Sequence, residues 1–338
     1  GGTRTRGLYT AVSQWSPVVF VSFANDGCLK ARQHADGITV INVPKTRQHQ
    51  AELNAVNAQF HVSVDDIIAG RHCSQSPYLS AIYRVLRQNA RCILIEHCYL
   101  VALPMFWGDR FVYSSQNHEA ALKKRLLNGH PLEKSLVDEV ESLERFAVEH
   151  SAAAIAVSIE DAEALVRRKR TAGPVIVVRN GTAEPAKGKV AEETKTNLSR
   201  EFDARSVVFL GSAHMPNVEA ARFIVKQLAQ QCPSVRLHIV GSVCSTIAKA
   251  PKNVKLWGVV DDQTKSVVMQ SCALAINPML SGSGSNVKLA DYIGNGLYVV
   301  TTEFGQRRYP PSVKEHLCSA SLHDFAAALE QTLNNSSL

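Results

Sequence analysis

The stretch Cys272–Gly305, CALAINPMLSGSGSNVKLADYIGNGLYVVTTEFG, holds two apolar runs with a glycine-rich loop and a helical pattern between them. CALAINP and LYVVTTEFG (297–305) have the apolar content typical of parallel strands that are buried on both faces. A helix is expected to begin at Val287, with Asn286 capping its start and Gly296 closing its end. The stretch therefore predicts a strand–loop–helix–strand unit of a parallel α/β sheet.

The loop of this unit has glycines at 282 and 284 and a lysine at 288, a spacing that fits neither the P-loop nor the dinucleotide fingerprint. Backbone N–H groups from Ser285 to Lys288 and the helix dipole favour a phosphate there, and Lys288 adds a full positive charge. Asp291 lies one helical turn further on the same face, where its carboxylate could accept two hydrogen bonds from a ribose. The pattern favours a nucleoside diphosphate, and the alternative is a capped helix with a local Lys–Asp pair.

The same alternation extends outward from this unit. Apolar runs at 206–212, 236–242 and 254–260 are expected strands of the second half, and two of them end in Gly-Ser turns, Gly211-Ser212 and Gly241-Ser242. Further strands are expected in the first half, at 17–23, 37–43, 92–97, 110–115, 153–158 and 174–180. The sequence thus predicts two doubly wound α/β domains, which bind ligands beyond the carboxyl ends of their strands.

A charged segment without a strong apolar run, residues 182–205, separates the two halves and is predicted to be an interdomain linker. This places an N-terminal domain at 1–181 and a C-terminal domain at 206–338. The cleft between two such domains is the first place to expect a ligand.

Composition narrows the possible partners. With 45% hydrophobic and 20% charged residues, the chain has the composition of a soluble globular protein, and no window reaches the ~18 uncharged apolar residues of a membrane span. The net charge of +7 favours nucleic acid, an anionic membrane surface or a phosphorylated ligand. Basic runs such as Arg307-Arg308 are usually solvated helix faces, and because no aromatic residues are interleaved with them, no nucleic-acid surface is expected.

The eight cysteines form no CxxC pair and several lie in apolar runs, which predicts reduced, buried thiols in a cytosolic protein rather than disulfides or a zinc site. No spacing of histidines argues for a metal either.

From Val207 onward the chain resembles the C-terminal domain of retaining glycosyltransferases of family 4, which have the GT-B fold of two Rossmann-like domains facing each other across a cleft. The matching segments occur in the family's order: VVFLGSAHMPNVEAARF, LHIVGS, NVKLWGVVDD, CALAINPMLSGSGSNVKLADYIGNG and LYVVTTEFGQR. The first half is more weakly similar, through FVYSSQNHEAALKKRLL, IAVSIEDAEAL and VIVVRNGTAEP. Gly1-Gly2 resembles the glycine pair that follows the family's first strand, so that strand is expected to be missing from this chain.

The resemblance implies roles on the donor side. Gly211-Ser212 and the amides from Gly284 to Val287 would face the donor diphosphate, Lys288 would pair with a phosphate, and Asp291 would hold the ribose. The segment from Trp257 to Val260 would line the base through backbone contacts, and Asn180-Gly181 would lie at the hinge between the domains. The candidate donor-binding residues are Gly211, Ser212, Val259, Ser283, Gly284, Ser285, Asn286, Val287, Lys288 and Asp291.

Two departures from the family pattern concern catalysis. The first of the family's two acids would fall at Ser283, so the acid that often contacts the donor sugar is absent. The histidine of the first domain falls at Gln116, and His118 could replace it if the segment is a strand end, because a shift of two keeps a side chain on the same face. The alternative for His118 is a plain helix N-terminus. Gln116, His118 and Lys288 are therefore the catalytic candidates.

On the acceptor side the candidates are Gly2 and His97. The alternative for His97 is a packed, hydrogen-bonded residue at the end of a strand.

The resemblance implies metal-independent, retaining transfer of a sugar from a UDP- or GDP-type donor to a saccharide or lipid-linked hydroxyl, with no cofactor. It also implies a cytoplasmic protein, with peripheral contact at the inner face of the membrane, that takes part in polysaccharide biosynthesis. Two alternatives stay open. One is a non-catalytic GT-B subunit that binds a nucleotide sugar or a protein partner, and the other is a sugar-nucleotide epimerase of the same architecture.

Overall fold

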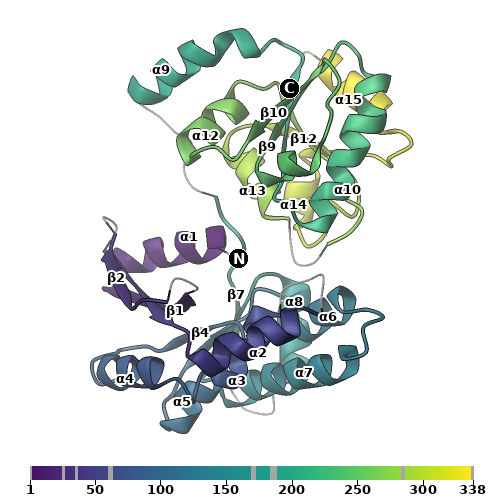
Figure 1. Ribbon diagram of the computed structural model, residues 1–338. Coiled ribbons are helices and arrows are strands. Elements are labelled where there is room, and N and C mark those ends of the chain that lie inside the picture. Colours follow the sequence, from purple (N-terminus) through teal and green to yellow (C-terminus); the bar gives the residue numbers. More distant parts are fainter. Residues whose placement is uncertain are drawn as a thin grey trace. The chain divides into compact units, whose positions relative to one another are not determined.

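Two compact units make up the chain, Gly1–Arg179 and Asn180–Leu338. The computed structural model describes residues 2–24, 27–34, 37–59, 64–168, 173–182, 189–282 and 286–335. Each unit contains a parallel sheet with helices packed around it (Figure 1). The predicted α/β class is therefore confirmed.

The second unit is built around a six-stranded parallel sheet with the strand order β10-β9-β8-β11-β12-β13. In that order the strands are Val254–Gly258, Arg236–Val240, Ser206–Leu210, Leu274–Asn277, Tyr298–Thr301 and Leu317–Ser319. The chain starts in the middle with β8, adds β9 and β10 on one side, and then crosses over to add β11, β12 and β13 on the other. The direction of winding reverses between β8 and β11, and open α/β sheets bind their ligands outside the carboxyl ends of the strands at such a point.

Helices cover both faces of this sheet (Figure 1). The α-helices of the second unit are α9 (Lys189–Leu198), α10 (Met215–Phe223), α11 (Ala229–Gln231), α12 (Asp262–Gln270), α13 (Val287–Gly294), α14 (Pro311–Lys314) and α15 (Phe325–Asn334). A π-helical turn, Ile224–Leu228, joins α10 to α11.

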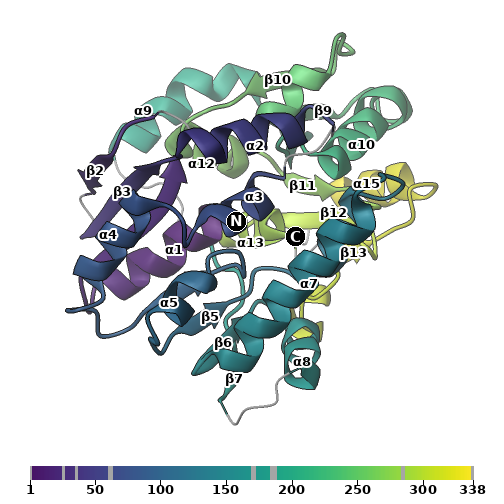
Figure 2. The same ribbon diagram turned by 60° about the horizontal axis from the view of Figure 1, so that its bottom comes forward.

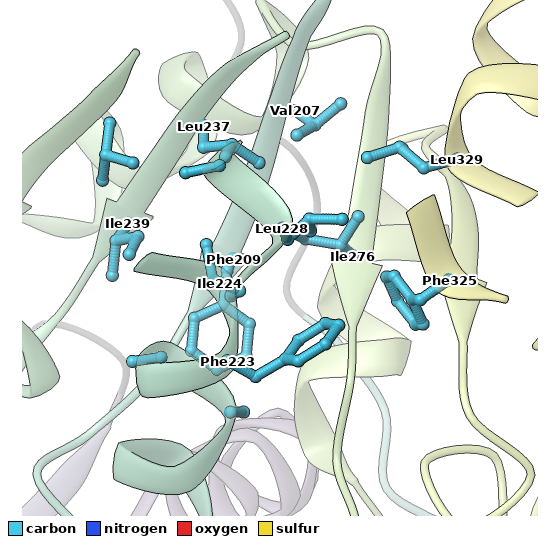
Figure 3. Close-up of a cluster of buried hydrophobic side chains, with 14 of the residues drawn as sticks. Val207, Phe209, Phe223, Ile224, Leu228, Leu237, Ile239, Ile276, Phe325 and Leu329 are labelled. Carbon is cyan, nitrogen blue, oxygen red and sulfur yellow. The ribbon is translucent and has the colours of Figure 1, made fainter. Parts of the chain in front are cut away.

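Alternate residues of β8 serve two separate cores. Val207 and Phe209 belong to an apolar cluster with side chains of α10, the π turn and α15, which converge on the strands in Figure 3. Val208 and Leu210 belong to a second cluster on the opposite face, together with Tyr292 of α13. All five side chains are at most 8% exposed, and burying an apolar side chain of this size contributes about 1.5–3 kcal/mol. The β8–β11 region is therefore packed on both faces, which stabilises the positions of the loops at its carboxyl end.

The first unit contains two sheets rather than one. Strands β4, β5, β6 and β7 (Leu94–Glu96, Val112–Ser114, Ala153–Ala156 and Val175–Val177) form a parallel four-stranded sheet. A separate three-stranded sheet has the order β1-β3-β2 (Val18–Ala24, Ile38–Pro44 and Lys30–Gln33), in which β2 runs antiparallel to β3. β1 and β3 were predicted as strands of a single doubly wound sheet. Because β3 pairs with β1 on one side and β2 on the other, neither of its edges pairs with β4.

The helices of the first unit are α1 (Gly2–Ser13), α2 (Arg47–Asn57), α3 (Asp65–His72), α4 (Pro77–Leu86), α5 (Ala102–Phe106), α6 (Glu119–Leu126), α7 (Glu133–His150) and α8 (Ile159–Arg168). α7 is the longest of them and packs against α6 and α8. Figure 2 shows α7 beside α8. The buried face of α7 contributes Leu136, Val140 and Ala147 to the core beneath the four-stranded sheet.

The segment predicted as a linker is partly helical. α9 lies within it and packs beside α12 of the second unit. The boundary between the units falls directly before Asn180-Gly181.

All eight cysteines are free. Four of them are buried, but Cys28 and Cys92 are exposed, which differs from the prediction because both lie outside the packed strands and helices. No helix in the described part of the chain is both long and apolar enough to cross a membrane.

Candidate functional site

Two glycines bring the carboxyl ends of β8 and β9 together. Gly241 has a φ of +111°, and a Cβ atom there would lie 2.2 Å from the carbonyl oxygen of Gly211, so only glycine fits. The same oxygen accepts a hydrogen bond from the Val243 N–H at 3.1 Å, and the N–H of Ala213 donates to Ser242 Oγ at 2.9 Å. The Gly211-Ser212 loop is thereby fixed at the switch point of the sheet.

Lys288, in the first turn of α13, turns its ammonium group toward this loop. Nζ donates to Asn217 Oδ1 at 2.7 Å, and Asn217 Nδ2 in turn donates to Ser212 Oγ at 3.1 Å. Nζ also lies 3.7 Å from Met279 Sδ and 4.3 Å from the centre of the Phe209 ring. The predicted pair Ser212 and Lys288 is therefore joined through Asn217, a residue that the sequence did not single out.

The charge of Lys288 has no carboxylate to balance it among the described residues. Burial lowers its pKa to about 7, and no neighbouring acid offsets this effect. An amide oxygen, a thioether and an aromatic face compensate a buried ammonium only in part. An anionic ligand would therefore be stabilised here by the full charge of the lysine.

Asp291 faces other partners than Lys288. Its Oδ1 accepts a hydrogen bond from Thr182 Oγ1 at 2.9 Å, and its Oδ2 lies 3.9 Å from Lys265 Nζ. A Cβ atom at Gly294 would lie 2.1 Å from Thr182 Cγ2, so the chain at 182 runs directly along α13. The local Lys288–Asp291 pair considered as an alternative does not form.

Asn286 precedes α13, as predicted, but its side chain makes no capping hydrogen bond. Its Nδ2 donates instead to the carbonyl oxygen of Gly305 at 2.7 Å, and its own carbonyl oxygen accepts from Tyr309 Oη at 2.7 Å. The capping prediction is wrong because the loop after β12 engages the side chain. Helix α13 does begin at Val287, and Gly296, with a φ of +77°, follows its end as predicted.

The loop after β12 brings a second cation to the glycine-rich segment. Arg307 Nη1 donates to the Phe304 carbonyl oxygen at 2.9 Å, and its guanidinium carbon lies 3.9 Å from the centre of the Phe304 ring. Arg307 Nη2 lies 3.2 Å from the point that a Cβ atom of Gly282 would occupy. The Arg307-Arg308 run was interpreted as a solvated helix face, but the chain here forms turns. In the sequence, the arginine pair at the end of LYVVTTEFGQRR is the signal that could have identified this second cation.

The remaining donor-side residues differ in how the structure places them. Val259 is 79% exposed at the carboxyl end of β10, whereas Trp257 is packed in a stack with Phe202 and His238. Ser283, Gly284 and Ser285 lie outside the described residues.

Gln116 is buried in the first unit, where both hydrogens of its amide are engaged. Nε2 donates to Thr5 Oγ1 at 2.8 Å and to Glu96 Oε2 at 2.7 Å. Glu96 Oε1 accepts a further hydrogen bond from Tyr9 Oη at 2.7 Å. Gln116 thus joins α1, whose first residue is Gly2, to the carboxyl end of β4.

His118 occupies the N-cap of α6. Its Nδ1 accepts from the Ala121 N–H at 3.1 Å and lies 3.8 Å from Glu144 Oε2. β5 already ends at Ser114, so the alternation of side chains along a strand does not relate Gln116 to His118. The interpretation of this segment as a strand end is wrong, and the helix N-terminus considered as an alternative is what forms.

His97 follows β4 with a φ of +60°. Its Nδ1 lies 2.8 Å from Oε1 of Glu119, which is 2% exposed. Burial disfavours the charged imidazolium, but the hydrogen bond and charge of Glu119 outweigh this, and the pKa of His97 is raised. In the described part of the chain no three or more His, Cys, Asp and Glu side chains cluster in a way that could hold a metal ion.

Residues 204–335, which include the Lys288 region, match the family model for Glycosyl transferases group 1. No curated protein matches the chain. Among solved structures, sucrose-phosphate synthase from Thermosynechococcus elongatus is 13% identical with a TM-score of 0.68, and 98% of this chain covers 83% of that one.

Two further structures are similar over comparable lengths. The α,α-trehalose-phosphate synthase (UDP-forming) from Burkholderia vietnamiensis is 11% identical with a TM-score of 0.64, covering 99% of this chain and 90% of that one. The catalytic domain of starch synthase IV from Arabidopsis thaliana, bound to ADP and acarbose, is 14% identical with a TM-score of 0.60, covering 99% and 88%. At these identities the structures establish the shared fold. The chain therefore has the GT-B fold, and its second unit matches the Glycosyl transferases group 1 model over residues 204–335.

Proposed function

We propose that this protein transfers a sugar, with retention of configuration, from a nucleotide diphosphate sugar of the UDP or GDP type to a hydroxyl of a saccharide or lipid-linked acceptor, without a metal or other cofactor. The observation that carries the proposal is the buried ammonium group of Lys288, which lies at the start of α13 without a carboxylate partner among the described residues. A pyrophosphate is an anion that such a position would stabilise.

The chemistry follows from the charge that develops on the departing diphosphate. Free N–H groups in the first turn of α13, Lys288 and the nearby Arg307 would meet that charge as the bond to the sugar breaks. Pre-placed donors of this kind stabilise a transition state by about 3 kcal/mol each. Because side chains supply this positive charge, the step needs no divalent cation. In the retaining route the acceptor hydroxyl attacks from the face that the diphosphate leaves.

Similar proteins support the donor class. One is named as UDP-forming and another holds ADP, so both names point to a nucleotide diphosphate at this fold. We also propose that the protein is cytoplasmic and contacts the inner face of the membrane peripherally, in keeping with its net charge of +7. Sedimentation with vesicles containing phosphatidylglycerol, compared with vesicles of phosphatidylcholine alone, tests the membrane contact.

The test begins with calorimetric titration of UDP-glucose, UDP-galactose, GDP-mannose and ADP-glucose. The expected result is selective binding of one donor, unchanged by EDTA. NMR of the product formed with a saccharide acceptor should show an anomeric configuration identical to that of the donor. An inverted product, or loss of turnover with EDTA, would contradict the mechanism.

A non-catalytic role stays a competing proposal because of Gln116. At the position that the family resemblance gives to a histidine, both amide hydrogens of Gln116 are bound within the first unit. Donor binding without turnover, across a panel of saccharide and lipid-linked acceptors, would favour that role. Conversion of the donor in the absence of any acceptor would instead indicate an epimerase.

A further inference from the structure

Two non-glycine residues in the described part of the chain have a positive φ, His97 and Arg308. A left-handed conformation is unfavourable for a residue with a Cβ atom, and such residues recur at functional sites. His97 directly follows Glu96, the last residue of β4, and so lies at the carboxyl edge of the parallel sheet of the first unit. This edge is where α/β sheets bind their ligands.

One nitrogen of His97 is fixed by a buried carboxylate. Nδ1 bonds Glu119 Oε1 at 2.8 Å, so the proton on Nδ1 is donated to the carboxylate. The other oxygen of Glu119 accepts from Tyr99 Oη at 3.1 Å, and the Glu119 N–H donates to Glu144 Oε1 at 2.7 Å. Glu119 is therefore held at both its backbone and its side chain, and it sets the plane of the imidazole ring.

The other nitrogen of His97, Nε2, has no hydrogen-bond partner among the described residues, and the side chain is 33% exposed. The surrounding acids are engaged elsewhere: Glu96 accepts from Tyr9 and Gln116, and Asp66 pairs with Lys123 at 2.6 Å. A fixed ring with one open nitrogen is the arrangement by which histidines present a hydrogen bond to a ligand.

The charges around His97 indicate the class of ligand. Glu96, Glu119 and Asp66 all act on the imidazole and favour its protonated form, against the effect of burial. Glu144 lies behind Glu119, and two cations act on these carboxylates, Arg4 on Glu96 and Lys123 on Asp66 and Glu119. Because four carboxylates face these two cations, the edge would disfavour a phosphate or carboxylate, but not a neutral hydroxyl.

We propose that His97 Nε2 donates a hydrogen bond to an uncharged hydroxyl of the saccharide acceptor, and that Glu119 is its positioning residue. This inference rests on the proposed glycosyl transfer, because it assigns a residue to the acceptor of that reaction. It also predicts that the part of the acceptor bound by the first unit is neutral.

Replacing His97 by asparagine distinguishes the role of Nε2 from that of Nδ1. Asparagine tolerates a positive φ, and its amide can reach Glu119 in place of Nδ1, but it has nothing at the position of Nε2. We expect His97→Asn to keep its thermal midpoint and its affinity for the selected donor, and to lower kcat/KM for the acceptor at least tenfold through a higher acceptor KM. His323→Asn, at a histidine whose side chain is 95% exposed, is the matched control and should change neither value.

Glu119→Gln tests the positioning role. The glutamine oxygen can still accept from Nδ1, but the negative charge is gone, so the acid form of His97 loses stability. The pH at which acceptor kcat/KM falls on the alkaline side should therefore move down, an effect that a merely structural role for Glu119 would not produce. An unchanged pH profile would overturn this part of the inference.

The outcomes distinguish this inference from the proposed function. If the wild-type protein turns over donor and acceptor but His97→Asn has the same acceptor KM and kcat, the role of His97 is wrong and glycosyl transfer stands. If no donor binds, glycosyl transfer fails, and NMR of imidazole-labelled protein still tests His97. Glucose should then shift the Nε2 resonance of His97 while UDP should not, and the absence of a shift with glucose overturns the inference.

Discussion

Lys288 in the second unit and His97 in the first are both basic side chains at the carboxyl edge of a parallel sheet, yet their surroundings are opposite. Lys288 meets an amide, a thioether and an aromatic ring, and burial lowers its pKa. His97 meets a buried carboxylate, and its pKa is raised. The first environment leaves a positive charge for a ligand to neutralise, whereas the second neutralises the charge internally. We therefore propose that the edge around Lys288 binds an anion and that the edge around His97 binds a neutral ligand.

The largest effect is expected from removing the charge of Lys288. Lys288→Met keeps the volume of the side chain but removes its charge, and we expect kcat to fall about 10²–10³-fold, as for the loss of one donor to a developing anion. Steady-state kinetics at saturating donor measure this, with the exposed Lys252→Met as control. Near-normal turnover would contradict the assignment.

Although Lys288→Met should lower kcat, it should increase the free energy of unfolding at pH 7. The pKa of Lys288 is lower in the folded chain than in the unfolded one, so the unfolded state binds more protons between about pH 7 and pH 10. The contribution of Lys288 to stability therefore rises with pH across this window and is unfavourable below it. Relative to wild type, Lys288→Met should be more stable at pH 7, with the difference shrinking toward pH 10. Urea unfolding at both pH values checks this.

Gly241→Ala tests whether the anion-binding edge depends on the contact between two loops. A Cβ atom 2.2 Å from the Gly211 oxygen must push the loops apart, and we expect a loss of about 3 kcal/mol in the free energy of unfolding. Gly258→Ala is the matched control, because Gly258 also has a positive φ, +68°, but no atom lies within 4 Å of the point that its Cβ would occupy. That variant should lose only about 1 kcal/mol. Equal losses in the two variants would mean that the positive φ, and not the contact with Gly211, determines the loss of stability.

Donor affinity should depend on pH in the way that a lysine with a lowered pKa requires. Binding of UDP-glucose holds Lys288 protonated, so above about pH 7 each binding event must take up a proton. The dissociation constant should then rise up to about tenfold per pH unit between pH 7.5 and pH 9. Calorimetry in buffers of different ionisation enthalpy measures the proton directly, and Lys288→Met should show no uptake.

The smallest effect is expected at Arg307, where a second cation lies beside Gly282. Arg307→Ala should raise the dissociation constant of UDP-glucose about fivefold, equivalent to about 1 kcal/mol. Arg307→Lys should restore part of the affinity, and Arg222→Ala, at an exposed arginine of α10, should have no effect. An unchanged constant in Arg307→Ala would confine the anion-binding edge to Lys288 and α13.

The fold of the second unit was predictable because its signals are local. Continuous apolar runs marked β8, β9, β11 and β12, and Val287 and Gly296 marked the two ends of α13. The strand predicted at 297–305 was too long, since β12 ends at Thr301 and the loop beyond it turns back to Asn286. β2 and β13 were missed because a short edge strand such as KARQ has no apolar run to reveal it.

A residue of the site could be predicted only where its role follows from the residues next to it in the sequence. Lys288 follows from the loop in which it lies. Asn217 is 71 positions away from Lys288, and Glu119 is 22 away from His97, so tertiary contacts alone assign both partners. The family resemblance singled out Gln116 and His118 as candidates. It could not show that Gln116 is hydrogen-bonded to Glu96 or that His118 caps α6.

The three-stranded sheet of the first unit has a consequence for local opening of the chain. β1 is only half-buried along its length and β2 is mostly exposed, whereas every residue of β8 is buried. Segments with few buried side chains open at lower free energy than the rest of a domain. Backbone amides of β1 and β2 should therefore exchange with deuterium well before those of β8, so the molecule loosens in stages rather than all at once.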